Sequence, residues 1–356
     1  MSGLERVVAF VISAGIVCAA SGQSWQNDYT WCHVGSAGNR AATAQEAPIM
    51  PGIGSVGYEF NMSQVPVTVG QYWEFVEAYL PHYESPGANF DFTGNWIHID
   101  LQGNVFPPEQ QWLNRPARPS FEYAARYVNW LHNGKVNESW AFESGVYDTS
   151  TFTGNSDGTY NHVAAPAAGA TVWIPTIDEW TKAFHYDPSK NGGGEEGYWL
   201  YPHSSDIAPI PGLPGEGGET DAGSPDFLFL FQDVGSYPNA ASPWGLLDAS
   251  GGEREWLSAS ELGSGRILIP DSSRGNQSWE LTDRLDWVLS WPPQLGGTSF
   301  RLVTAVPGPS VLPALWCVAV YSLRRQGRSN DTNETLGFAR IDRCCDERRI
   351  RGGQCL

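Results

Sequence analysis

Glycine and proline interrupt this chain so often that long regular elements are excluded over most of its length. The 356 residues include 40 glycines and 25 prolines, and only 17% of the residues are charged. Apolar residues make up 41% of the chain, which is enough for a sizeable core. We therefore predict many turns and short strands, with helices only where a continuous apolar stripe survives.

Three segments keep such a stripe. Residues 69–80 place apolar side chains at helical spacing, after a strand–turn–strand pattern over residues 55–69. Residues 120–134 predict a longer helix, with Ser120 as its N-cap and Asn133-Gly134 at its end.

The third helix is predicted within residues 173–188, where Thr176 and Glu179 form a capping box and Pro188 ends the run. Helices among short strands and long loops predict an irregular, loop-rich α+β domain over residues 53–306. Residues 23–52 are polar and rich in alanine and glycine, which predicts a loose leader.

Both ends of the chain carry segments with the pattern of targeting signals. Residues 1–22 combine Arg6 with a short apolar run and small residues, the pattern of a cleaved export signal rather than a membrane anchor. Residues 307–325 are a proline-rich hinge, an apolar stretch and two arginines, which predict a sorting or anchoring signal; the alternative is a last core strand. Residues 326–356 show no pattern that we can interpret.

Charge and motif content exclude several functions. The net charge is −18, so the chain repels phosphate backbones and nucleic acid is not expected as a partner, whereas a cation or a sugar is compatible. The seven histidines lack zinc-site spacing. The GIGSVG run at residues 52–57 precedes a predicted strand rather than a helix, so it does not predict dinucleotide binding.

The segment PWGLLDASGGEREWLS, residues 243–258, is the strongest candidate site. Calcium takes oxygen ligands from carboxylates and backbone carbonyls, and glycines let a chain fold around the ion. Asp248 and Glu255 offer carboxylates for a cation, with carbonyls from Gly251 and Glu253. Two alternatives remain open: Asp248 and Glu255 are a general acid–base pair, or the segment is a polar turn.

Six blocks in order along the chain resemble the formylglycine-generating enzyme family, also called the sulfatase-modifying factor domain. The blocks are YEFNMSQVPVTVGQYWEFVEA, RPSFEYAARYVNWL, WIPTIDEWTKAF, SPWGLLDASGGEREW, RGNQSW and SFRLV. The resemblance implies an irregular α+β fold related to C-type lectins and stabilised by calcium. It implies one calcium site with side-chain oxygens from Asp248 and Glu255 and backbone carbonyls from Gly251 and Glu253.

Catalysis is where the chain departs from this family. The resemblance implies copper held by two cysteines, but Leu281 and Asp286 stand at those positions, and no cysteine lies between residues 33 and 316. Thiolates are the soft ligands that select Cu(I), so copper is not expected. Residues 307–325 resemble the Pro-Glu-Pro sorting signals of bacterial envelope proteins, with Gly308 where glutamate is usual.

These observations predict an exported protein of the cell envelope, cell surface or extracellular space that binds a surface glycan or another exported protein. Formylglycine generation is not expected, and a membrane is expected to be contacted only through the C-terminal segment. An alternative is an enzyme with an unrecognised metal- or carboxylate-based activity on a sulfatase, peptide or glycan. A further alternative is a matrix protein with no discrete ligand.

Overall fold

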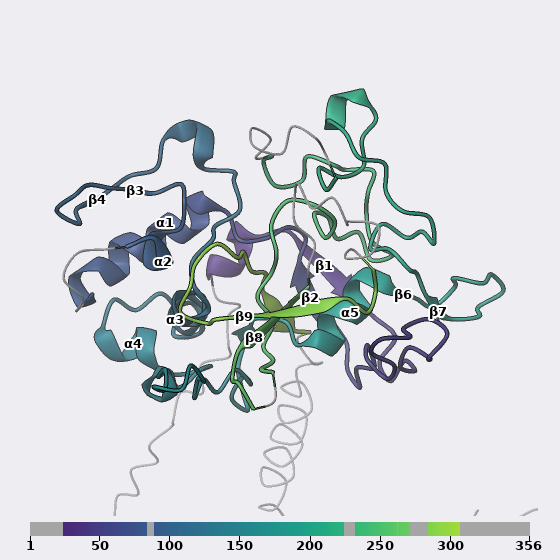
Figure 1. Ribbon diagram of the computed structural model, residues 1–356, viewed down its shortest axis with the longest axis horizontal. Helices are drawn as coiled ribbons and strands as arrows, with labels where there is room; N and C mark the ends of the chain where they lie inside the picture. Colours follow the sequence, from purple (N-terminus) through teal and green to yellow (C-terminus); the bar gives the residue numbers. More distant parts are fainter. Residues whose placement is uncertain (1–23, 84–88, 224–231, 262, 271–283, 307–356) are drawn as a thin grey trace, which may run out of the picture. The chain divides into compact units, whose positions relative to one another are not determined.

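A four-stranded antiparallel sheet joins segments from both ends of the described chain (Figure 1). The computed structural model divides the chain into residues 1–306 and 307–356. The strand order is β1–β2–β10–β5. The strands are β1 (Trp31–Val34), β2 (Phe60–Ser63), β10 (Val303–Ala305) and β5 (Val172–Trp173). The structure describes residues 24–83, 89–223, 232–261, 263–270 and 284–306.

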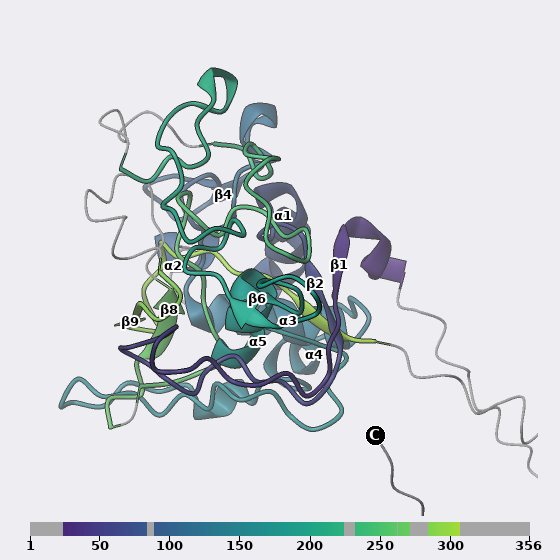
Figure 2. The ribbon, with the colours of Figure 1, turned by 90° about the vertical axis from the view of Figure 1, so that its right-hand side faces the viewer.

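The segment predicted as a loose leader is part of this sheet. Strand β1 pairs with β2, with Cys32 opposite Met62, and the two strands lie side by side in both views (Figures 1 and 2). Trp25, Cys32 and Val34 are buried in the main core. The prediction of a loose leader over residues 23–52 was therefore wrong. Residues 31–34 form a strand whose partner comes later in the chain, and the polar residues around them gave no sign of it.

Helix α1 (Val69–Tyr79) confirms the first predicted helix. Thr68 and Gln71 form a capping box at its start, and Val69, Tyr72, Phe75 and Val76 are buried. The second half of the predicted strand–turn–strand is absent, since the residues after β2 lead directly into this helix.

Helix α3 (Phe121–His132) confirms the second predicted helix and ends at Asn133, followed by Gly134 with a φ of +73°. Ser120 occupies the N-cap position, but its side chain makes no capping hydrogen bond. Helix α5 (Ile177–His185) has the predicted capping box of Thr176 and Glu179. It ends before Pro188 because the following residues form strand β6.

The remaining elements are short, as the glycine and proline content predicts. The strands are β3 (His98–Ile99), β4 (Val105–Phe106), β6 (Tyr186–Asp187), β7 (Gly197–Tyr198), β8 (Ile267–Pro270) and β9 (Val288–Trp291). The helical turns are α2 (Phe90–Thr93), α4 (Ser139–Glu143), η1 (Ser24–Asp28), η2 (Leu80–His82), η3 (Gln110–Trp112), η4 (Thr149–Thr151) and η5 (Pro214–Glu216). The α+β prediction is confirmed. Within the described ranges, no helix is long and apolar enough to cross a membrane.

Candidate functional site

The predicted site segment folds into a turn built on left-handed backbone. Asp248 has a φ of +61° and Gly251 a φ of +75°. A Cβ atom added to Gly251 would lie 2.3 Å from Oδ1 of Asp221 and 2.5 Å from Oγ1 of Thr220. Glycine is therefore required at position 251 both by its backbone conformation and by the close approach of the Thr220-Asp221 segment.

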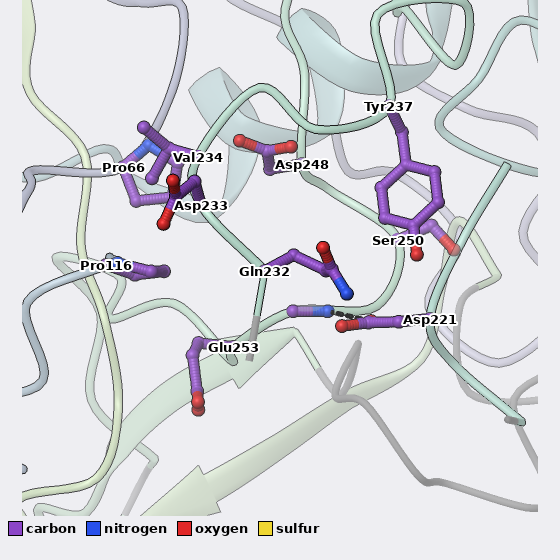
Figure 3. Close-up of a pocket in the computed structure, with 11 residues that line it drawn as sticks. Pro66, Pro116, Asp221, Gln232, Asp233, Val234, Tyr237, Asp248, Ser250 and Glu253 are labelled. Atoms are coloured by element: carbon purple, nitrogen blue, oxygen red, sulfur yellow. Dashed lines mark hydrogen bonds between the residues drawn. The ribbon is translucent and has the colours of Figure 1, made fainter. Parts of the chain in front are cut away.

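This turn forms one wall of a small cavity of about 20 Å³, which we call the acidic cavity. Four carboxylates line it, from Asp221, Asp233, Asp248 and Glu253. A space of this size holds one water molecule or one ion. In Figure 3 the carboxylates come from different sides and do not converge on one point.

Asp248 is a buried acid of this cavity with a raised pKa. Burial of its carboxyl raises the pKa to about 6, against the hydrogen bond that Oδ2 accepts from the Gly235 N–H at 2.6 Å. Near neutral pH the carboxylate is therefore ionised, but it gains a proton under mildly acidic conditions.

The other three acids of the cavity have partners. Glu253 Oε2 lies 3.0 Å from Nε of Arg118, and Asp233 Oδ1 lies 3.1 Å from Nε of Arg115. Asp221 Oδ1 accepts the Gly252 N–H at 2.5 Å. Two arginines thus already supply positive charge at the edge of the cavity.

Glu255, the second predicted carboxylate ligand, does not line the acidic cavity. Its carboxylate is 3% exposed and forms a two-pronged ion pair with the fully buried Arg301: Nη2 lies 2.7 Å from Oε1 and Nε lies 2.8 Å from Oε2. Trp180 Nε1 donates to Oε2 at 3.1 Å. The guanidinium already neutralises this carboxylate, so a cation or a proton bound by Glu255 would have to compete with Arg301.

The four residues of the predicted calcium set are therefore divided between the acidic cavity, its turn and the Arg301 ion pair. Among the described residues there is no group of three or more histidine, cysteine, aspartate or glutamate side chains placed to hold an ion, and the predicted set relies on two side chains and two backbone carbonyls instead. Asp248 and Glu253 line the acidic cavity, whereas Gly251 lies beside it in the turn. Asp221 and Asp233 were missed by the sequence analysis because they approach from a separate glycine-rich loop.

The resemblance places the copper-binding cysteines at positions 281 and 286, and the structure describes only the second of them. Leu281 lies outside the described residues. Asp286 is fully buried, and its Oδ2 accepts the Ile49 N–H at 2.6 Å. Cys32 is a free thiol in the core, and burial raises its pKa, which keeps it protonated.

A second hollow, of about 260 Å³, lies beside the β3–β4 hairpin. Trp96 and Trp112 stack within it, with ring centroids 4.8 Å apart and planes at 24°. We call it the tryptophan groove, and its lining residues are Asn95, Trp96, His98, Pro107, Glu109 and Trp112. An open depression that shares Asn95 and His98 extends it along Phe90.

The groove combines an apolar wall with a polar rim. Trp96 packs against the main core, which fixes the ring pair, while Asn95, His98 and Glu109 are exposed. The sequence analysis missed this site, since only the number of aromatic residues hinted at it. The two tryptophans are separated by a hairpin and meet only in the folded chain.

The chain matches no family model and no curated protein sequence. Among solved structures, the crystal structure of CarF is similar with a TM-score of 0.47 and 18% identity, over 78% of this chain and 99% of CarF. The structure of PvdO from Pseudomonas aeruginosa is similar with a TM-score of 0.41 and 14% identity, over 78% of this chain and 94% of PvdO. The function is therefore argued from the chain's own residues.

Proposed function

We propose that this chain is an exported, non-catalytic protein of the formylglycine-generating enzyme type that binds a glycan through the tryptophan groove. The observation that supports this proposal is the stacked pair of Trp96 and Trp112 beside three exposed polar side chains. Sugars are amphipathic, with C–H faces and hydroxyl edges. An aromatic wall with a few polar groups at its rim complements both.

The ring pair also limits the entropic cost of binding. Trp96 is held by the core and Trp112 stacks on it, so little side-chain freedom remains to be lost when a ligand docks. The rim supplies an amide from Asn95, an imidazole from His98 and a carboxylate from Glu109. These groups offer both donors and acceptors for hydroxyls.

The cysteine content supports the non-catalytic part of the proposal. Copper held by two thiolates needs two cysteines, but residues 24–306 contain only Cys32, which is buried on β1. We expect no formylglycine in a cysteine-containing sulfatase peptide incubated with the protein and copper, as measured by mass spectrometry. Formation of formylglycine would overturn this part of the proposal.

Export and attachment to the cell envelope belong to the same proposal. They depend on residues 1–22 and 307–325, which lie outside the described residues. We expect the expressed full-length chain to lose residues 1–22 and to fractionate with the envelope or the medium, as measured by N-terminal sequencing of each fraction. A cytoplasmic chain with an intact N-terminus would contradict it.

Calcium remains a prediction of the sequence, with side-chain oxygens from Asp248 and Glu255 and backbone carbonyls from Gly251 and Glu253. Carboxylate oxygen is the donor type that calcium prefers, but Glu255 would have to exchange Arg301 for the ion. We expect a chelator to lower the melting temperature and added calcium to restore it in the wild type, but not in Asp248→Asn. An unchanged melting temperature in the wild type would remove calcium from the account.

A glycan array tests the binding proposal and identifies the sugar. We expect the full chain to bind a restricted set of glycans without altering them, and Trp112→Ala to lose that binding. Trp140→Ala is the matched control, since Trp140 is 56% exposed and lies outside the groove. An array with no bound glycan, or turnover of a bound one, would contradict the proposal.

A further inference from the structure

A separate cavity of about 350 Å³ lies between the end of α1 and the helices α3 and α4. We propose that this cavity, which we call the helical cavity, binds a small polyhydroxylated ligand that carries an amino group, such as an amino sugar. It shares no lining residue with the tryptophan groove, so the two sites can be tested separately.

Helical spacing brings the polar groups of the cavity together. Glu122 and Arg126 are one turn apart on α3, and Ser139 and Glu143 are one turn apart on α4. Side chains at this spacing lie on the same face of a helix. Helices α3 and α4 contact each other (Figure 1), and side chains from both line the cavity.

Arg126 and Glu143 form a fixed floor rather than a free binding pair. Arg126 Nε lies 2.9 Å from Oε1 and 3.1 Å from Oε2 of Glu143. The hydroxyls of Tyr79 and Thr149 also donate to this carboxylate. Burial acts to raise the pKa of Glu143, but Arg126 and the hydroxyls of Thr149 and Tyr79 together outweigh it and the pKa is lowered, so Glu143 stays ionised.

Glu122 is the carboxylate that remains available to a ligand. Its Oε1 lies 2.8 Å from Nε2 of His162, whose side chain is fully buried. Oε2 makes no hydrogen bond to any residue that the structure describes. The contact with Nε2 of His162 orients Glu122, so Oε2 can accept a hydrogen bond from an ammonium group.

Charge decides which ligands enter. Glu122 and Glu143 outnumber Arg126, so the cavity is formally negative, and the whole chain carries a net charge of −18. This field disfavours phosphates, sulfates and sugar acids and favours a cationic amine. The recognition of an amine is therefore assigned to Glu122.

Three phenols provide the complementary hydrogen bonds for hydroxyl groups. Tyr79, Tyr83 and Tyr123 line the cavity, and their rings pack around Phe92 with centroid distances of 5.7, 4.8 and 5.0 Å. Burial raises the pKa of Tyr79 and Tyr123, so both stay protonated. The Tyr79 hydroxyl donates to Glu143 and the Tyr123 hydroxyl is hydrogen-bonded with Tyr83, so both offer acceptor lone pairs to the hydroxyls of a ligand. The volume lies near the lower end of the range for small-molecule pockets, which suits a ligand of monosaccharide size.

The test titrates the full chain with glucosamine and with N-acetylglucosamine, whose amide carries no charge, and measures binding by calorimetry. We expect glucosamine to bind and N-acetylglucosamine to bind about tenfold more weakly or worse, since a hydrogen bond to a charged group is lost. Equal binding of the two sugars, or no binding of glucosamine, would overturn the proposal without any variant.

The substitution Glu122→Gln keeps the shape of the side chain and removes its charge. We expect it to weaken glucosamine binding about tenfold, while Glu109→Gln and Trp112→Ala in the tryptophan groove leave it unchanged. Glucosamine binding that survives in Glu122→Gln, or is lost in Trp112→Ala, contradicts the helical cavity as the site. Trp112→Ala is expected to lose binding on the glycan array but to keep glucosamine binding. A failed glucosamine test therefore contradicts the helical cavity and leaves the proposed function untouched.

Discussion

The acidic cavity and the tryptophan groove use their polar groups in opposite ways. Around the acidic cavity, a space of about 20 Å³, carboxylates are matched by arginines and by backbone N–H groups. In the tryptophan groove, of about 260 Å³, Asn95, His98 and Glu109 are exposed beside an apolar wall. The conspicuous acidic segment is thus mainly structural, and the surface suited to a ligand comes from a stretch without a motif.

If this contrast is right, the largest stability loss follows removal of Arg301. Arg301→Met leaves the buried Glu255 without its partner, and we expect a loss of about 3–5 kcal/mol in the free energy of unfolding. Urea denaturation measures it. Glu59→Gln is the control, because Glu59 pairs with His33 at the surface, with side chains 46% and 51% exposed, and should cost at most about 1 kcal/mol. Equal losses in the two variants would show that the Glu255 pair is not specially structural.

Asp248 makes the stability of the acidic cavity sensitive to pH. Its pKa is about 6 in the folded protein against an ordinary value of 3.8, so the folded state holds the proton more tightly. The wild type should therefore lose stability relative to Asp248→Asn as the pH rises from about 4 to 6, by up to about 3 kcal/mol. Urea denaturation of both proteins across this range, in chelator, measures it. Parallel pH profiles would contradict the raised pKa.

The turn of the acidic cavity offers a sharper comparison between neighbouring glycines. Gly251→Ala combines left-handed backbone with a clash against Asp221 and should cost about 1–3 kcal/mol. Gly252 has a φ of +62° but no atom within 4 Å of an added Cβ, so Gly252→Ala should carry the backbone strain alone. Thermal melting of the two variants measures the difference. A Gly252→Ala variant as unstable as Gly251→Ala would remove the close approach as the cause.

Local signals in the sequence predicted the helices well. The capping box of Thr176 and Glu179 and the apolar stripes of α1 and α3 depend on residues within a few positions of each other. Strand β1 was missed because its partner, β2, begins 26 residues after β1 ends and nothing within residues 31–34 requires a strand. Strand pairing over such distances leaves little local pattern.

The site residues were likewise hard to predict where their partners are distant in the sequence. Asp248 and Glu253 do line a common cavity, but Glu255 was assigned with them because its partner, Arg301, lies 46 residues later. Alternation of acidic residues along a turn does not reveal which carboxylate meets a guanidinium. The pairing of Trp96 with Trp112 likewise depends on the β3–β4 hairpin and could not be read from their spacing.

The most direct test of the account is a calorimetric titration of the glycan that the array selects, with the wild type, Trp112→Ala and Trp140→Ala side by side. We predict that Trp140→Ala binds like the wild type and that Trp112→Ala binds about tenfold more weakly or worse, with both variants folded. If Trp112→Ala binds as tightly as the wild type, the tryptophan groove is not the binding site and the central claim fails.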